Sequence, residues 1–552
     1  MAGAQPPDPI TTAVIGSALG TIVEEMTRAL MRAGYSTSIK ERMDVSAALM
    51  DENGLILAQA DLQPAHLGSL LGITRRVLQT TGRHEIRPGD LFIGNDAYEG
   101  GGTHLNDIVF IEPVFEGGAI VAWLANIAHH ADFVDRGHAH IFQEGLRIPP
   151  VRLYRGGVLD QDVLDLVLLN CQVPHERLND FRAQKAANHT GMRRFAELVA
   201  KYGWPLIAAA SRAVLDHTER RTRAGIRRMP NGVYEATGLL NSGRCSEILE
   251  LRVRIEVSDE DILMDFRGNP KQVRAPINLT YMALLVSVYF ALKVLVDPEV
   301  PANAGFHRPI RVLADPGTIV CADPPGAVYS RTDTMERLCD LIFTALAPAV
   351  PAAAIAPCTG RGLLTISGVD PRSGRYYVYN EAMGGGAGAH ADQDGATAVQ
   401  VHVANSRNIP VEVVEFEYPL RVECYELVTD SGGAGAHRGG LSYRRRVRVL
   451  GHSARAFVTG NDLAITTWGI EGGLAAPSGR LTPGEGVAPF VLGRGVIGPG
   501  QTVEIAPSGG GGWGDPRRRD PALLRRDVRE GKVSQRAARE LYGLDDEVPA
   551  GG

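Results

Sequence analysis

The stretch GGTHLNDIVF places a histidine and an aspartate three residues apart, and further histidines follow shortly afterwards. The residues that could act together are His104, Asp107 and His129. Imidazole nitrogens and carboxylate oxygens bind Zn, Mn or Fe, and a site with only three protein ligands keeps positions open for water or substrate. The six cysteines are scattered and form no C-x-x-C pair. We therefore expect any metal on this chain to be held by histidine and carboxylate groups.

The segment 107–130 is predicted to be a β-hairpin, because two runs of β-branched and aromatic residues flank a glycine pair. Asp107 and His129 are equidistant from Gly118 in the predicted turn. Antiparallel pairing would place them side by side at the open end, with Cβ atoms roughly 5 Å apart. A register error of one residue would turn one of them to the other face of the sheet. The hairpin thus predicts that strand pairing brings an imidazole and a carboxylate together.

His104 lies in the glycine-containing loop before this hairpin and can fold back to the same point. Asp44, which begins an earlier predicted hairpin, is a candidate fourth ligand. The alternative is structural, because histidine and aspartate at turns and strand ends commonly serve as capping or hydrogen-bonding residues. Spacing alone leaves both explanations open, a metal site or a polar hairpin end.

Other elements would have to position this cluster. A helix is predicted over 11–33, where apolar residues recur every three or four positions. Asn53-Gly54 is a strong turn signal inside a hairpin over 44–60. Further along the chain, the patterns predict helices over 160–225, strands over 249–266, an apolar helix after Pro276 and a charged helical tail over 521–544.

Together these patterns predict a multidomain α+β protein with a hairpin-rich N-terminal metal region and a β-rich C-terminal part, rather than one doubly wound sheet. The 552 residues exceed one ordinary hydrophobic core. Shifts in composition divide the chain into four regions: an α+β metal-binding region over 1–225, a central α+β region over 226–420, a β-rich region over 421–516 and a charged helical tail over 517–552.

Composition argues against several classes of protein. The net charge of −6 offers no basic surface for nucleic acid. The longest apolar run has about a dozen residues, and crossing a membrane takes roughly 20. Because no signal-peptide pattern is seen and the cysteines are scattered, we expect a cytoplasmic protein with reduced thiols. No Walker loop occurs, so we attribute the glycine runs in 383–395 and 508–516 to tight turns with positive φ.

Several sequence blocks, in order along the chain, resemble the hydantoinase B/oxoprolinase family. They include KERMDVSAALMDENGLILAQA, PAHLGSL, AHHAD, EGLRIPP, DFRGNPKQVRAPIN, GAGAHRGGLSYRRRVRV and GGGGWGDP. A further block covers residues 87–115 and contains GGTHLNDIVF. The resemblance covers about residues 8–516. The family includes B-type subunits of N-methylhydantoinase and caprolactamase, the corresponding half of 5-oxoprolinase, and subunits of acetone and acetophenone carboxylases.

The resemblance implies a hydantoinase B-like fold and a division of labour between subunits. A hydantoinase A-type partner would bind ATP and Mg and activate the substrate, in an α2β2-type hetero-oligomer. The B-type chain would carry one divalent metal ion (Zn, Mn or Fe) where a carbonyl is bound and attacked. Carried over position by position, the metal ligands fall on Asp44, His104, Asp107 and His129.

The implied activity is ATP-dependent hydrolysis of a cyclic amide or imide, such as a hydantoin, oxoproline or a lactam. Candidates for proton transfer are His130, Asp132 and Glu144, and candidates for substrate binding are Arg42, His66 and Arg147. Support of the ligands or salt bridging is at least as good an explanation for five of them: His130, Asp132, Glu144, Arg42 and Arg147. Two alternatives remain: a subunit of an ATP-dependent ketone carboxylase, or a non-catalytic structural or regulatory subunit.

Overall fold

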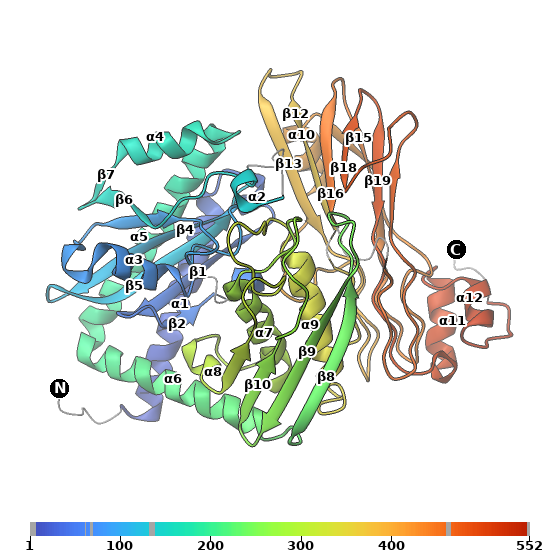
Figure 1. Ribbon diagram of the computed structural model, residues 1–552, viewed down its shortest axis with the longest axis horizontal. Helices are drawn as coiled ribbons and strands as arrows, with labels where there is room; N and C mark the ends of the chain where they lie inside the picture. Colours follow the sequence, from blue (N-terminus) through green and yellow to red (C-terminus); the bar gives the residue numbers. More distant parts are fainter. Residues whose placement is uncertain are drawn as a thin grey trace. The chain divides into compact units, whose positions relative to one another are not determined.

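The protein is described by a computed structural model, and its chain divides into two compact units (Figure 1). The described residues are 7–60, 62–66, 70–131, 139–360, 362–459 and 465–548. The first unit comprises Met1–Val233, Glu256–Arg267 and Gln272–Arg331, and the second comprises Tyr234–Ile255, Gly268–Lys271 and Thr332–Gly552. Both units combine helices with mainly antiparallel sheets, as an α+β fold requires. The predicted division into four regions stays a prediction.

The first unit is built on a seven-stranded antiparallel sheet with the order β2-β1-β5-β4-β3-β6-β7. Its strands are β1 (Val45–Asp51), β2 (Ile56–Gln59), β3 (Leu91–Gly94), β4 (Asp107–Glu116), β5 (Ala119–His129), β6 (Val151–Arg155) and β7 (Val158–Leu159). Both predicted hairpins are confirmed, because β1 pairs with β2 and β4 pairs with β5. The turn between β4 and β5 lies at Gly117 and Gly118, both with positive φ.

Long helices cover one face of this sheet. They are α1 (Pro9–Ala33), α5 (Pro174–Tyr202) and α6 (Trp204–Ile226). Leu49 of β1 and Leu124 of β5 pack against them. The other face packs against α3 (Ile73–Thr81), with Trp123 and Ile127 of β5 in that core. Consecutive side chains of β5 therefore point to opposite faces, as the pleat of a strand requires.

The remaining elements of the first unit are mostly short. The helical prediction over 160–225 is confirmed as α4 (Gln161–Leu169), α5 and α6, and the apolar helix after Pro276 is α7 (Tyr281–Val296). Shorter elements are α2 (Thr37–Lys40), α8 (Ala304–His307), β10 (Asp261–Asp265) and β11 (Ile310–Leu313). The chain passes between the two units within β8 (Gly232–Leu240) and β9 (Leu249–Ser258).

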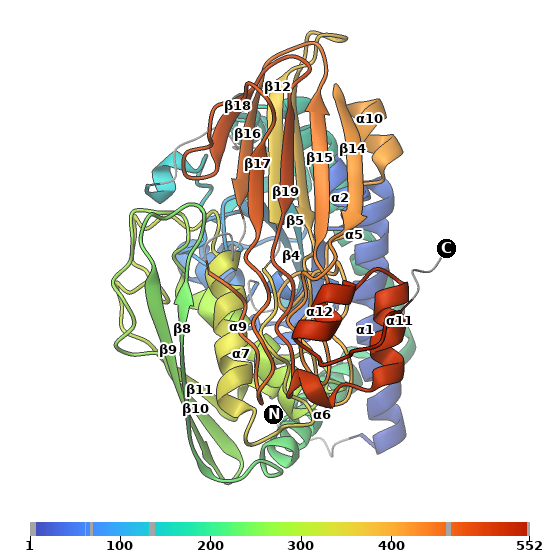
Figure 2. The same ribbon diagram turned by 90° about the vertical axis from the view of Figure 1, so that its right-hand side faces the viewer.

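Two four-stranded sheets form the β-rich part of the second unit (Figure 2). One has the order β13-β12-β16-β18 and the other β14-β15-β19-β17. The strands are β12 (Gly362–Val369), β13 (Tyr376–Met383), β14 (Leu420–Leu427), β15 (Tyr443–Val449), β16 (Ala454–Thr459), β17 (Arg480–Pro483), β18 (Arg494–Ile497) and β19 (Thr502–Ala506). Side chains of both sheets, such as Ile366 and Val447, share one core, so the sheets pack face to face.

Helices of the second unit are α9 (Thr332–Leu346), α10 (Val411–Glu417), α11 (Pro521–Arg529) and α12 (Gln535–Glu540). The prediction of one helical tail over 521–544 is wrong in detail. The tail forms two short helices, and Gly531 between them has a φ of 70°. Among the helices of the described segments, none combines the length and the apolar character that crossing a bilayer requires.

The explanation of the glycine runs by positive φ is also wrong. Among the described glycines of 383–395 and 508–516, only Gly514 has a positive φ. The others bring backbones into close contact: a Cβ atom on Gly510 would lie 1.9 Å from the carbonyl oxygen of Ala387. These runs therefore contain glycine because loop backbones pack directly on one another.

Candidate metal centre

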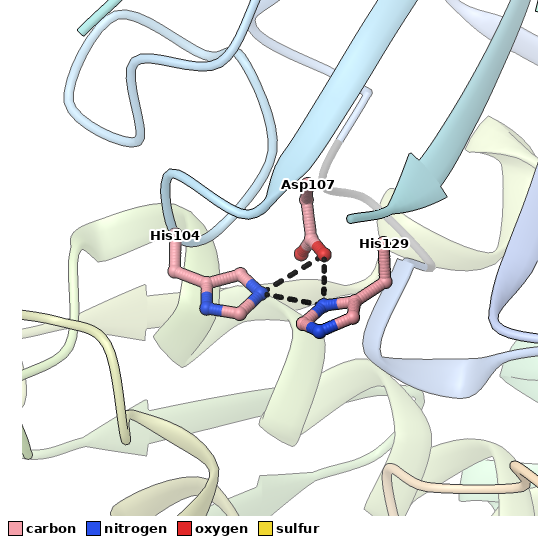
Figure 3. A group of neighbouring side chains, drawn as sticks. All are labelled: His104, Asp107 and His129. Carbon is pink, nitrogen blue, oxygen red and sulfur yellow. Dashed lines mark hydrogen bonds and ion pairs between the residues drawn. The ribbon is translucent and has the colours of Figure 1, made fainter. Parts of the chain in front are cut away.

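Three of the predicted ligands meet at the open end of the β4–β5 hairpin (Figure 3). Nε2 of His104 lies 2.9 Å from Oδ1 of Asp107 and 3.2 Å from Nδ1 of His129. That Nδ1 lies 3.2 Å from the same Oδ1. All three side chains are buried. Ligand atoms bound at about 2.1 Å to one ion lie roughly 3 Å apart, so the donor set fits a divalent metal ion.

The register of the hairpin brings two of these groups together. Asp107 of β4 pairs directly with His129 of β5, which confirms the predicted juxtaposition. Ala128, the residue before His129, packs with α5. Because side chains alternate along a strand, His129 points to the opposite face, where Asp107 also points.

A tight turn brings His104 to the same point. The backbone N–H of Asp107 donates a hydrogen bond to the carbonyl oxygen of His104, at 3.1 Å. Gly102, two residues before His104, has a φ of 83°, and a Cβ atom there would lie 3.0 Å from Cβ of Asp107. Glycine at this position thus lets the loop turn back over the end of the strand.

Asp44 lies beside the three donor atoms, although it is not one of the mutually adjacent group. It immediately precedes β1, and its carbonyl oxygen accepts a hydrogen bond from the backbone N–H of His129, at 3.0 Å. Its carboxylate accepts hydrogen bonds from Gln63 Nε2 at 2.8 Å and from Arg42 Nη2 at 3.2 Å. Two neighbouring side chains therefore fix the carboxylate next to the cluster.

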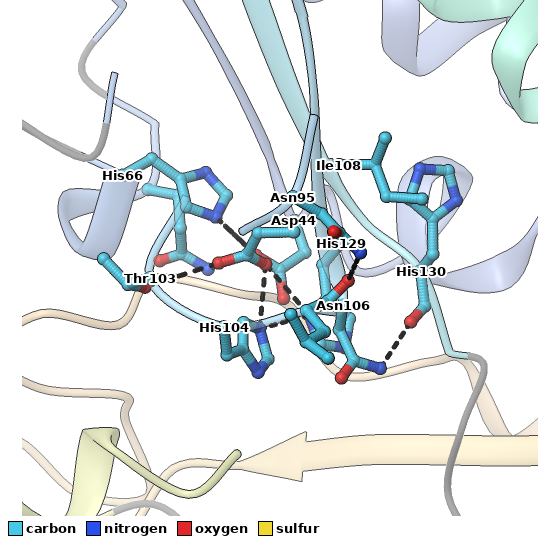
Figure 4. A network of polar contacts seen from close by, with 12 residues as sticks. Asp44, His66, Asn95, Thr103, His104, Asn106, Ile108, His129 and His130 are labelled. Carbon is cyan, nitrogen blue, oxygen red and sulfur yellow. Dashed lines mark hydrogen bonds and ion pairs between the residues drawn. The ribbon is translucent and has the colours of Figure 1, made fainter. Parts of the chain in front are cut away.

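His66 lies beside Asp44 (Figure 4) and also approaches the carboxylate of Asp107. Its Nε2 atom is 3.7 Å from Oδ1 of Asp44 and 3.8 Å from Oδ1 of Asp107. The side chain is buried in the short 3-10 turn Pro64–His66. Of the three predicted substrate-binding residues, Arg42 and His66 thus lie beside the candidate ligands. Arg147 instead pairs with Asp96, Nη2 to Oδ2 at 2.7 Å.

Sequence reasoning misses Arg331, which holds the second oxygen of Asp107. Its Nη2 atom lies 3.0 Å from Asp107 Oδ2, and its Nε donates to Thr103 Oγ1 at 2.8 Å. Both charged side chains are almost fully buried. No local pattern could reveal this contact, because 224 residues separate the two partners along the chain.

The charges at the site are set by burial and by these partners. Burial raises the pKa of Asp107, but His104 and Arg331 outweigh it and hold that pKa well below the usual value. Burial raises the pKa of Asp44 too, but electrostatic attraction to His129, Arg42 and His66 outweighs burial and lowers it. Burial, assisted by Arg331, lowers the pKa of His104 to about 3, and burial lowers the pKa of His129. At neutral pH the carboxylates are ionised and the imidazoles neutral, the forms in which they bind metals.

The structure does not bring His130 together with the three donors. Its ring lies on the α5 side of the sheet, with Nε2 3.2 Å from Oε1 of Gln184 and an edge-on contact to Phe181. Its carbonyl oxygen accepts a hydrogen bond from Asn106 Nδ2 at 2.7 Å (Figure 4). The ring contacts thus anchor the residue after β5 to α5, and the bond from Asn106 joins it to the loop before β4.

Glu144, another proton-transfer candidate, does not join the cluster either. Glu144 is buried, and its Oε1 accepts hydrogen bonds from the backbone N–H groups of Val328 and Tyr329, both at 2.7 Å. The ring of Tyr329 lies 5.9 Å from that of His104. Glu144 therefore supports a turn that borders the site. Asp132 lies outside the described residues.

Known proteins resemble this chain in sequence over nearly its whole length. Residues 8–516 match the family model for hydantoinase B/oxoprolinase. The chain belongs to the hydantoinase B/oxoprolinase family. The beta subunit of caprolactamase from Pseudomonas jessenii is 32% identical to it, over 97% of this chain and 96% of that subunit.

Two solved structures confirm the predicted fold class. The crystal structure of the ATP-dependent caprolactamase from Pseudomonas jessenii is similar with a TM-score of 0.85 and 31% identity, over 98% of this chain and 97% of that one. Nucleotide-free acetone carboxylase is similar with a TM-score of 0.89 and 19% identity, over 99% of this chain and 81% of that one. The hydantoinase B fold therefore extends over essentially the whole chain.

Proposed function

We propose that this chain is the metal-binding, B-type subunit of an ATP-dependent hydrolase that opens cyclic amides or imides. The observation that carries the proposal is the buried cluster of His104, Asp107 and His129 in a chain 32% identical to a caprolactamase subunit. Two histidines and one carboxylate form a ligand set of catalytic zinc sites, which keep a further position open. The substrate class that we propose comprises hydantoins, oxoproline and lactams.

In this proposal Asp44, His104, Asp107 and His129 hold one divalent ion of the Zn, Mn or Fe type. Such an ion, when bound, polarises a carbonyl or lowers the pKa of a bound water towards about 7. Arg331 neutralises Asp107 and keeps its second oxygen turned away from the other donors. At Asp44, Arg42 donates to Oδ2 and Gln63 donates to Oδ1, so both oxygens of that carboxylate are held.

We place the substrate next to His66, whose Nε2 faces the oxygens of both carboxylates. An imidazole there can donate or accept a hydrogen bond, which suits the alternating N–H and C=O groups of a cyclic amide. Arg147 and His130 act as positioning residues rather than in contact with substrate, because Arg147 pairs with Asp96 and His130 contacts residues of α5.

The energy for ring opening would come from a partner. Resonance stabilises an amide, and transfer of the γ-phosphate of ATP to its carbonyl oxygen, with release of ADP, makes the carbonyl carbon open to attack by water. The adduct then breaks its C–N bond, which opens the ring, and a second water hydrolyses the acyl phosphate to a carboxylate and phosphate. We propose that a hydantoinase A-type subunit performs this ATP-dependent step, since the caprolactamase relative is itself a beta subunit. The fold likeness to acetone carboxylase makes ketone carboxylation the competing reaction.

The test is to co-express the chain with an A-type subunit and measure ATP hydrolysis with hydantoin, 5-oxoproline, a lactam, and acetone with bicarbonate. We expect a cyclic amide to stimulate ATP hydrolysis, and His129→Ala to abolish the stimulation. His84→Ala, which removes an exposed histidine, is the matched control and should behave as the unmodified chain. Stimulation by acetone with bicarbonate alone would overturn the proposal.

A further inference from the structure

A second group of metal-binding side chains lies in the other unit of the chain. Within the described residues, Asp340, Cys358 and His402 each offer one donor atom, and these atoms all lie within 4.8 Å of one another. Nε2 of His402 is 2.7 Å from Oδ1 of Asp340. All three residues are buried. This group includes a thiol, contrary to the expectation that any site would contain only histidine and carboxylate ligands.

Three separate segments supply the three donors. Asp340 lies inside α9, Cys358 lies in the segment between α9 and β12, and His402 lies between β13 and α10. The backbone N–H of Cys358 donates to Oδ1 of Asp340 at 2.9 Å, so the thiol segment is fixed directly to the helix. Oδ2 of Asp340 is paired with Nη1 of Arg337 at 3.2 Å. The carboxylate thus keeps one oxygen toward the other two donors.

The glycine run of 384–388 orients a hydrogen-bond donor toward the sulfur. The backbone N–H of Gly388 donates to Sγ of Cys358 at 3.1 Å. A Cβ atom on Gly388 would lie 1.6 Å from the carbonyl oxygen of Ala356, so only glycine allows this approach. Hydrogen bonds from neighbouring groups commonly orient and tune metal ligands, including sulfur ligands. Glycine at position 388 therefore allows the hydrogen bond to the sulfur of Cys358, which lies outside the first metal site.

His402 is held in an uncommon backbone conformation. Its φ is 54°, in the left-handed region that non-glycine residues rarely occupy. Its ring lies against Phe343 of α9, with the centroids 5.4 Å apart. Conformations of this kind persist where the surrounding structure requires them, often at ligand sites. Here the conformation directs Nε2 at Asp340.

We propose that Asp340, Cys358 and His402 bind a second divalent metal ion, of the zinc class, that ties α9 to the loops on either side of the β12–β13 hairpin. Sulfur, imidazole and carboxylate ligands together favour zinc over magnesium or calcium. The three donors come from separate segments, so an ion bound by all of them would fasten these segments to one another. Structural zinc ions stabilise folds in this way.

Metal analysis of the full chain, prepared with zinc, tests this site separately from the first. We expect about two ions per chain in the unmodified protein, and the loss of about one in Cys358→Ser. Cys245→Ser, which changes another buried cysteine, should lose none. His129→Ala should lose a different ion, so the combined variant should retain almost none. One ion or fewer per unmodified chain, with Cys358→Ser unchanged, would overturn the proposal.

Cobalt provides a readout on the unmodified chain itself. The first site contains no sulfur ligand, so a thiolate-to-cobalt absorption band in the unmodified chain reports only the second site. We expect this band when Co²⁺ replaces zinc, and we expect it to persist in His129→Ala. Cobalt binding without the band would overturn the proposal, even if ATP-dependent hydrolysis were established.

Discussion

At the scale of single residues, the first site depends on how buried charges are paired. Asp107 contacts two imidazoles with one oxygen and Arg331 with the other. Because burial alone would favour the protonated carboxyl, these partners keep the group ionised. The chemistry proposed for the site therefore depends on Arg331 as well as on the ligands.

Arg331→Met should destabilise the chain by about 3 kcal/mol, because it removes the cation that balances the buried Asp107 carboxylate. Urea unfolding of the variant and the unmodified chain measures this difference. In an Asp107→Asn background the same substitution should cost much less, since no charge remains to be paired. Equal losses in both backgrounds would show that the ion pair does not matter to stability.

We predict that titration of Glu112 makes the unfolding free energy depend on pH, independently of the metal site. Burial raises its pKa to about 7 from an ordinary value of 4.5, despite Lys185 and a hydrogen bond from Asn188. The folded chain thus holds this proton more tightly than the unfolded chain does. The contribution to stability is fully retained below about pH 4.5 and is lost as the pH rises through 7.

Glu112→Gln should remove this loss. We expect the variant to exceed the unmodified chain in unfolding free energy by up to about 3 kcal/mol at pH 8, and to match it near pH 4.5. Urea unfolding at the two pH values measures the difference. A gain that is the same at both pH values would contradict the explanation by titration.

At the scale of elements, the hairpin is the most predictable part of the site. Its β-branched runs and glycine turn are local signals, and they suffice to predict the pairing of Asp107 with His129. Arg331 and Gln63 cannot be predicted, because they reach the site through tertiary packing and lie in no periodic pattern. The prediction for the glycine runs is wrong for a physical reason. A glycine that lets two backbones pack closely gives the same local sequence pattern as a glycine in a tight turn.

Because side chains alternate along a strand, we predict different roles for the adjacent residues His129 and His130. His130→Ala should lower the unfolding free energy by about 2–4 kcal/mol, because it removes a buried ring packed against α5. It should leave the metal content unchanged, since the ring lies on the other face of the sheet from the donors. Chemical denaturation and metal analysis of the same sample measure both effects. Loss of metal without loss of stability would contradict both predictions for His130.

At the scale of the whole molecule, each unit has its own core and its own cluster of potential ligands. The family match covers residues 8–516 and so includes both units. In our proposal the first cluster serves the reaction and the second serves the structure, while ATP is handled by a partner chain. Substrate and partner are therefore tested on the complex, and the metal sites are tested on the single chain.

Metal content of the single chain is the most direct test of the central claim that His104, Asp107 and His129 hold a catalytic metal ion. Asp107→Ala and His129→Ala should each lose about one ion per chain that Cys358→Ser retains. Circular dichroism of the same samples checks that the variants are folded. If both folded variants keep the full metal content of the unmodified chain, the cluster at the end of the hairpin is not a metal site.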